Sequence, residues 1–348
     1  MDSVPDRWGR FLQDRREAQS AREESRARCL LHESDYLLGV FDGHRMGGLR
    51  FRVEPFGAFL DDNREFVSPP WTSLRELEQA SLALEREGVE SDTNYRKWLR
   101  MLIAPGGSLG GARPKAGALD AQGRLWIAKF PSRGDTLDVG AWEWILHQLA
   151  KRAGIVVPQA EARTFNSSRH TFLTKRFDRT EDGGRVHFAS AMTLLNRKDG
   201  DDFSSGASYL ELAELILKQG ARPDSDLEQL WRRILFFVCV SNADDHLRNH
   251  GFLLERKGWY LSPAYDMNPD PYADGLKLNI SDVENAQDIG LVLEVAPYFR
   301  IAPLRAKAII SDVVAVVRGW REVAQKQGVA RSEIEGMEFA FRVADRGV

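Results

Sequence analysis

The pattern of apolar and polar positions changes twice along the chain and predicts an α+β protein. The first part combines helical periodicity with two short strands, the second is rich in strand patterns, and the third is mainly helical. We therefore predict three domains: 1–103, 104–178 and 179–348.

The predicted elements of the outer domains are mostly helices with 3.6-residue periodicity. In the first domain we expect helices over 1–38, 73–90 and 94–103, and two strands within 40–53. In the third domain a loop is expected over 184–202, with helices over 207–218, 226–240, 303–326 and 332–344.

The middle domain is predicted to contain two hairpins with one helix between them. Strands are predicted over 116–120, 125–130, 155–165 and 170–179, and the helix over 136–153.

One short hairpin organises the polar residues of the third domain. The turn ERKG, residues 255–258, separates GFLL from WYLSP, so residues whose numbers sum to roughly 514 should face each other. Asn249 then lies near Ala264 and Tyr265. We expect Asp244, Asn249 and Asp266 to converge on one small volume.

These side chains suit a hard cation, because Mg²⁺ binds through one or two carboxylates together with substrate phosphates. Asp244 and Asn249 are five residues apart, which is the spacing of the base and the metal ligand in a protein-kinase catalytic loop. Asp266 fits the later metal-binding aspartate. The alternative is a solvated loop whose Asp and Asn side chains only cap the next element.

A glycine-rich loop opens the middle domain at PGGSLGGARPK, residues 105–115. Such a loop lets backbone N–H groups surround an anion, although this one matches neither the P-loop nor the GxGxxG pattern and a plain linker would look similar. Lys129 shares its strand face with Leu125 and Ile127, where an ammonium favours an anionic partner. The alternative is an edge-strand lysine that extends to water.

The helix after this strand carries Glu143 in a mainly apolar stretch. A strand lysine paired with a helix glutamate after a glycine loop is the kinase arrangement that positions ATP phosphates, although Glu143 could equally be an ordinary surface acid. Residues 175–178 then correspond to the hinge against which adenine packs, with Phe177 as the apolar contact.

Composition gives no sign of a nucleic-acid or membrane partner. The 48 basic and 51 acidic residues leave a net charge of −3, and the most apolar run, residues 234–240, is too short to span a bilayer. Cys29 and Cys239, both in segments expected to be helical, form neither a disulfide framework nor a metal cluster. We expect a cytoplasmic protein without a membrane contact.

Taken together, the motifs resemble the HipA family of bacterial serine/threonine kinases, the toxin components of type II toxin–antitoxin modules. The resemblance covers nearly the whole chain. It is carried by PDRWGR, SDYLLG, SLGGARPK, WIAKFP, KRFDR, NADDHLRN and YDMNP. It implies a bilobal protein-kinase-like fold with a β-rich N-lobe, an added N-terminal module and a mainly helical C-lobe.

The resemblance also implies roles for particular residues. Asp244 would be the catalytic base, Asn249 and Asp266 the Mg²⁺ ligands, and Lys129 the contact to the ATP phosphates, paired with Glu143. Family members can phosphorylate a serine in their own glycine loop, here Ser108. The other residues expected at the nucleotide are Gly110, Gly111, Ala112, Lys115, Lys175, Phe177, His246 and Tyr265, together with Ser108 itself.

Many family members carry a further small subdomain ahead of PDRWGR, for which this sequence has no room. We expect either a separate small protein that supplies it or a start placed too late. Family analogy further suggests an aminoacyl-tRNA synthetase as substrate and a helix-turn-helix antitoxin as partner, with DNA contacted only through that antitoxin.

Three other interpretations remain open at this stage. A small-molecule kinase would use the same nucleotide machinery with a different acceptor pocket. A nucleotide-sensing or antitoxin-binding module would leave the centre idle, against which the complete set of Asp244, Asn249, Asp266 and Lys129 argues. A metallohydrolase built on the DDH sequence would leave the glycine loop and Lys129 without a task.

Overall fold

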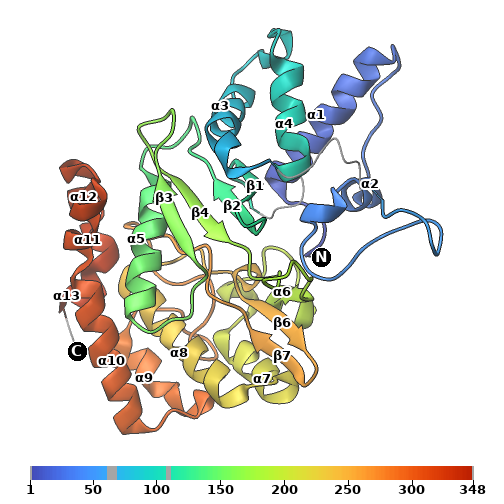
Figure 1. Cartoon of the computed structure of the whole chain (residues 1–348). Coiled ribbons are helices and arrows are strands. Elements are labelled where there is room, and N and C mark those ends of the chain that lie inside the picture. The colour runs from blue at the N-terminus through green and yellow to red at the C-terminus, as the bar shows by residue number, and fades with distance from the viewer. Residues whose placement is uncertain (1, 61–68, 107–110, 347–348) are drawn as a thin grey trace. The chain divides into compact units, whose positions relative to one another are not determined.

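The computed structural model describes residues 2–60, 69–106 and 111–346. The chain forms two compact units. Unit 1 comprises Met1–Gly140 and Gln159–His187, and unit 2 comprises Ala141–Pro158 and Phe188–Val348. Figure 1 labels most of the helices and strands of both.

Unit 1 is built on a four-stranded antiparallel sheet with the order β1-β2-β4-β3. The strands are β1 (Lys115–Leu119), β2 (Leu125–Lys129), β3 (Ala160–Arg163) and β4 (Thr171–Lys175). The helices α1 (Arg7–Glu23), α3 (Leu74–Leu84) and α4 (Tyr95–Gly106) lie next to β1 (Figure 1). They bury Leu12, Leu77 and Leu99 against Ala116 and Trp126, so one continuous apolar core joins these helices to the sheet.

The first predicted helix is wrong in its length. Two helices, α1 and α2 (Glu33–Leu38), replace the single helix expected over 1–38. Ser25 has a φ of 52°, a left-handed conformation that does not continue a helix. Cys29 lies in the connecting segment and is exposed, which corrects the expectation that it is helical.

The two strands expected within 40–53 are also wrong. The structure has the short 3₁₀ helix η1 (Asp42–His44) followed by irregular backbone. The carbonyl oxygens here are used by side chains, since Arg176 Nη1 donates to His44 O at 2.6 Å and Arg179 Nη2 to Arg45 O at 2.8 Å. Arginine donors thus take the acceptors that a neighbouring strand would need.

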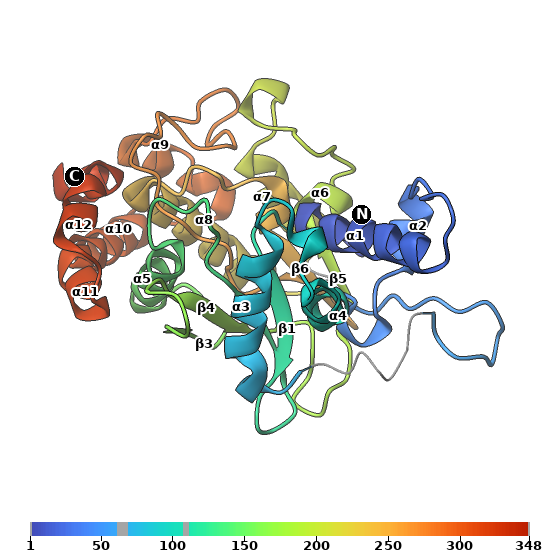
Figure 2. The same ribbon diagram turned by 90° about the horizontal axis from the view of Figure 1, so that it is seen from above.

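Unit 2 is mainly helical, as expected, and its centre is α8 (Pro223–Val240). The second half of α8 is buried on every side, from Leu230 to Val240. Its neighbours include α7 (Tyr209–Gln219), α9 (Ile289–Glu294), α10 (Pro303–Arg318) and α13 (Arg342–Arg346). Figure 2 shows α10, α11 (Trp320–Gln327) and α12 (Arg331–Gly336) together near the C-terminus.

Aromatic packing joins α5 (Val139–Arg152) to these C-terminal elements. The Trp142 ring centroid lies 6.1 Å from that of Trp320, which stacks on Phe341 at 4.1 Å. Trp142 Nε1 also donates to Glu333 Oε1 at 2.7 Å.

A three-stranded antiparallel sheet with the order β5-β6-β7 completes unit 2. It consists of β5 (Phe188–Ser190), β6 (Gly251–Glu255) and β7 (Gly258–Leu261). Glu255 pairs with Gly258 and Phe252 with Leu261, so the register predicted from the ERKG turn is confirmed to within one residue. The loop expected over 184–202 is corrected in part, because it contains β5 and the single-turn helix α6 (Ala191–Leu194).

Within the described ranges, none of the helices combines the length and the apolar character that a membrane crossing requires.

Candidate active site

The loop that carries Asp244 begins where α8 ends. Ser241 has a φ of 49°, and this left-handed residue stops the helix and turns the chain. Ser241 is fully buried, and its carbonyl oxygen accepts a hydrogen bond from Asp270 N at 3.0 Å. The start of the Asp244 loop is therefore tied to the segment that follows Asp266.

The two adjacent aspartates of the DDH sequence have opposite environments. Asp244 is exposed, whereas Asp245 is 1% exposed. Asp245 Oδ2 accepts hydrogen bonds from Tyr209 Oη and from His250 Nε2, both at 2.7 Å. Asp245 is thus held inside the protein as an acceptor, and Asp244 is the carboxylate that an external hydroxyl can reach.

The charge of Asp245 favours the protonated forms of two buried neighbours, Tyr209 and Arg233. Burial, followed by the charge of Asp245, raises the pKa of Tyr209 well above its ordinary value, so the phenol keeps its proton and remains a donor. Burial lowers the pKa of Arg233 in α8 to about 10, and the negative charge of Asp245 opposes that decrease. The sequence gives no sign of this network, because it joins α7, α8 and the loop.

Asn249 is oriented by the same loop. Its Nδ2 donates to the carbonyl oxygen of Asp244 at 3.2 Å, which leaves Oδ1 as the end of the amide that can ligate a cation. His246 O accepts from Asn249 N at 2.8 Å, and His246 N donates to Asp244 O at 3.1 Å. Asp244, His246 and Asn249 therefore belong to one tight turn.

The loop that carries Asp266 runs beside this turn. Tyr265 Oη donates to Arg248 O at 2.7 Å, and Asn268 N donates to Asn242 Oδ1 at 2.8 Å. Asp266 lies between these two tethers and has a φ of 58°, an uncommon left-handed conformation for an aspartate. The tethers hold the loop of Asp244 and Asn249 next to the loop of Asp266, in agreement with the hairpin register.

The donor set around Asn249 and Asp266 suits Mg²⁺ only together with ligands from a substrate. Among the residues that the structure describes, no three His, Cys, Asp or Glu side chains form a metal-binding group. One carboxylate and one amide oxygen match a Mg²⁺ ion that takes its remaining ligands from phosphates and water. The metal roles of both residues stay predictions.

The described end of the glycine loop is fastened by the N-terminal PDRWGR sequence. Asp6 Oδ2 accepts from Gly111 N at 2.6 Å, Trp8 N donates to Gly111 O at 3.3 Å, and Trp8 Nε1 donates to Lys115 O at 2.9 Å. Ser108 and Gly110 lie outside the described residues, and Ala112 is exposed. The N-terminal module thus sets the geometry in which the loop joins β1.

Lys115 and Lys129 face each other across β1 and β2. Directly opposite residues share one face of a sheet, and two like charges there repel unless an anion lies close. Lys115 is buried, and Lys129 Nζ lies 5.9 Å from the centroid of the Phe172 ring. This pair gives unit 1 two positive groups after the glycine loop, and both lysines are among the residues predicted to lie at the nucleotide.

The expected hinge, residues 175–178, carries a buried ion-pair cluster. Asp178 Oδ2 lies 2.6 Å from Arg176 Nη2 and 2.6 Å from Arg179 Nη1, and it accepts from Gly47 N at 2.7 Å. Burial alone would raise the pKa of Asp178, but the two arginines outweigh it and the pKa falls to about 2. The Lys175 ammonium pairs with Glu181, and Phe177 is half-buried.

Glu143 is buried in α5, within unit 2, while Lys129 belongs to unit 1, and their pairing stays a prediction.

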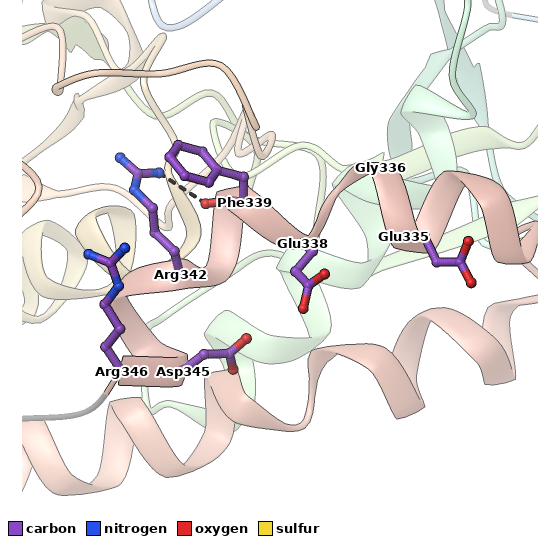
Figure 3. A pocket seen from close by; sticks show the side chains of 7 residues that line it. All are labelled: Glu335, Gly336, Glu338, Phe339, Arg342, Asp345 and Arg346. Carbon is purple, nitrogen blue, oxygen red and sulfur yellow. Dashed lines mark hydrogen bonds between the residues drawn. The ribbon is translucent and has the colours of Figure 1, made fainter.

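A separate open cavity of about 550 Å³ lies on the C-terminal elements and contains none of the predicted site residues (Figure 3). Its lining includes Phe339 and Arg342.

The fold is protein-kinase-like. A solved structure of HipA from *Shewanella oneidensis* MR-1, in complex with HipB and operator DNA, matches with a TM-score of 0.55 and 19% identity, over 69% of this chain and 65% of that chain. The model of the HipA-like C-terminal domain matches residues 107–320, more than half of the sequence. The chain belongs to the family of proteins with a HipA-like C-terminal domain.

Two curated relatives come from *Sinorhizobium fredii*, and their names suggest kinases. Y4dM is 24% identical over 242 residues, which are 65% of this chain and 56% of Y4dM. Y4mE is 28% identical over 147 residues, which are 40% of this chain and 33% of Y4mE. The matched part thus spans about half or less of each relative.

Proposed function

We propose that this protein transfers the γ-phosphoryl group of ATP to a serine or threonine hydroxyl of another protein. The observation that carries the proposal is the placement of exposed Asp244 in one turn with Asn249, beside the tethered Asp266 loop. This placement supports Asp244 as the base and Asn249 and Asp266 as metal-binding side chains, the roles that such residues have in phosphoryl transfer by kinases.

In this mechanism Asp244 orients the acceptor hydroxyl and takes its proton. The hydroxyl oxygen forms a bond to the γ-phosphorus as the bond from that phosphorus to the bridging oxygen breaks, and ADP leaves. Bound Mg²⁺, held by Asn249 and Asp266, would neutralise charge on the phosphates. Lys129, with Lys115 opposite it, would contribute positive charge at the phosphates, and Glu143 would orient Lys129.

The remaining predicted residues would contact the other parts of the nucleotide. Phe177 and Lys175 would lie at the adenine, and His246 and Tyr265 would flank the nucleotide from the catalytic side. Ala112, with Gly110, would offer backbone N–H groups to the phosphates, and Gly111, whose N–H is bonded to Asp6, would let the backbone approach them without a side chain in the way. Ser108 in the same loop would be a site of autophosphorylation.

Family membership supports a proposal for the biological setting. The *Shewanella* HipA structure contains HipB and operator DNA. We infer a corresponding role here as the cytoplasmic toxin component of a toxin–antitoxin module, with a helix-turn-helix antitoxin that provides the contact to DNA. An aminoacyl-tRNA synthetase is the proposed substrate.

The test incubates the purified chain with γ-labelled ATP and Mg²⁺, alone and with bacterial lysate. Loss of a general base typically lowers the rate by about 10² to 10⁴, so Asp244→Asn should almost abolish transfer without a change in the urea midpoint. Ser108→Ala should remove the self-label only. Asp282→Asn, an exposed acid of unit 2, is the matched control.

Label on one lysate protein, absent with Asp244→Asn, would support the proposal and identify the substrate by mass spectrometry. Transfer by Asp244→Asn at a tenth of the wild-type rate or better would overturn the assignment of Asp244. Label on aminoglycosides, choline or sugars in place of protein would indicate a small-molecule kinase. No transfer by a folded protein that binds ATP would overturn the proposal and indicate a nucleotide-binding module without transfer activity.

A further inference from the structure

Arg342 connects the C-terminal helices to both loops of the candidate site. It is the first residue of α13 and directly follows the 3₁₀ helix η8 (Glu338–Phe341). Its guanidinium lies 4.2 Å from the centroid of the Phe339 ring, and Nη1 donates to Phe339 O at 3.0 Å (Figure 3). These two contacts fix the direction in which the side chain leaves the helix.

The other donors of Arg342 reach three separate segments of unit 2. Nη1 donates to Ser241 Oγ at 3.2 Å, and Nη2 donates to Ala273 O at 3.0 Å and to Gln287 Oε1 at 2.6 Å. Ser241 precedes Asp244 by three residues, and Ala273 follows Asp266 by seven. One planar guanidinium therefore bonds to the segment before the base and to the segment after the metal-binding aspartate.

Ser241 connects Arg342 to the segment that follows Asp266 as well as to the loop of Asp244. Its Oγ lies 2.8 Å from Ala340 O and 3.0 Å from Gln287 Oε1, so its single hydrogen can be donated to either while Oγ accepts from Arg342. Its backbone carbonyl holds Asp270 N at 3.0 Å. A displacement of Ser241 would move the chain that leads to Asp244 and the chain that follows Asp266 together.

We propose that Arg342 is a positioning residue for phosphoryl transfer, acting through Ser241 on Asp244 and through Ala273 on Asp266. The inference rests on the proposed function of those two aspartates. Arg342 does not touch the reacting atoms. Its effect arises because a displacement of about 1 Å in a catalytic group can cost about 10²-fold in rate.

Arginine suits this task better than lysine. A guanidinium presents its five N–H donors in a rigid plane and can serve several acceptors at once, whereas an ammonium on a flexible stem presents three donors at one point. Arg346 offers a matched comparison, because it lies in the same helix and lines the same cavity as Arg342 (Figure 3).

The experiment compares Arg342→Ala, Arg342→Lys and Arg346→Ala in the whole chain with wild type. It measures kcat and KM for ATP, and amide hydrogen exchange over residues 241–250 and 266–274. We expect Arg342→Ala to lower kcat by about 10-fold or more with little change in KM, and to speed exchange in both segments. Arg342→Lys should recover part of kcat, and Arg346→Ala should match wild type.

A double-mutant cycle with Ser241→Ala tests the proposed route. If Arg342 acts through Ser241, the two changes together should lower kcat by less than the product of their separate effects. If the double variant lowers kcat by the full product of the two separate effects, Arg342 and Ser241 act independently. That result would overturn the route through Ser241.

Two further outcomes separate this inference from the proposed function. An Arg342→Ala protein with a lower melting temperature but wild-type kcat and exchange in both segments would show a merely structural role and overturn the inference. If wild type itself transfers no phosphoryl group, the proposed function fails. Hydrogen exchange then still decides whether Arg342 positions the two loops.

Discussion

Tyr209 Oη donates a hydrogen bond to Asp245 Oδ2 at 2.7 Å, and neither side chain reaches solvent. His250 Nε2 contacts the same oxygen at 2.7 Å. Asp245 precedes Asn249 in the chain and His250 follows it. The buried carboxylate therefore connects α7 to the loop both before and after Asn249. The second aspartate of the DDH sequence is therefore a structural residue, and the exposed Asp244 is the one proposed as the base.

Tyr209→Phe should destabilise the protein by about 1.5 to 3 kcal/mol, because it removes one hydrogen bond to a buried charged group. Urea unfolding at pH 7 measures this difference. Tyr272→Phe is the control, since Tyr272 is 87% exposed, and it should leave the urea midpoint unchanged. Equal midpoints for the two variants would show that the bond to Asp245 contributes nothing to stability.

Asp266→Ala and Asn249→Ala should each weaken ATP binding in the presence of Mg²⁺ and have little effect in its absence. The reason is that both side chains are proposed to contact the nucleotide through the metal. Calorimetric titration of ATP with Mg²⁺ and with EDTA checks this, and EDTA should bring wild type close to the variants. A wild-type dependence on Mg²⁺ in either variant would count against the metal role of that residue.

Gly111→Ala should lower ATP affinity by displacing Lys115. Gly111 has a φ of 91°, and a Cβ atom there would lie 2.5 Å from Lys115 Nζ. Gly123→Ala is the matched control, because its φ is 75° but no atom lies within 4 Å of the added carbon. Both changes should cost about 1 kcal/mol or more in stability through backbone strain. Only Gly111→Ala should raise the Kd for ATP, and equal Kd values would argue against a role of Lys115 at the phosphates.

Asp178 should make unit 1 sensitive to acid. Its folded pKa of about 2 lies below the ordinary value of 3.8, so its contribution is present above about pH 4 and is lost as the pH falls towards 2. The shift corresponds to about 2 kcal/mol. Unfolding followed from pH 6 to pH 2 should show this loss in wild type and a smaller loss in Asp178→Asn.

At neutral pH, Asp178→Asn should be destabilised by about 3 to 5 kcal/mol, because Arg176 and Arg179 lose their buried partner. Glu322→Gln, which breaks an exposed ion pair with Lys326, should change stability by less than about 1 kcal/mol. A pH profile of Asp178→Asn that matches wild type would refute the contribution of Asp178.

Local patterns were sufficient for much of the fold. The strands β1 and β2 and the helices α5, α7 and α8 were predicted close to their observed bounds, since each combines a regular apolar period with a nearby turn or helix start. The strand predicted over 170–179 begins as expected but ends earlier, at Lys175. The failures fall on segments held by distant partners. Residues 40–53 lack strands because arginines from beyond residue 175 bind their carbonyl oxygens.

The sequence by itself determined which chemical groups are present and, through the ERKG turn, that Asn249 and Asp266 belong to facing segments. These are local properties, because a tight turn sets the register of its own hairpin. Only the tertiary structure decided that Asp245 is buried, that Asp6 binds the glycine loop and that Arg342 joins the two loops. Each of these contacts joins residues 36 to 105 positions apart, and packing, not local periodicity, brings such partners together.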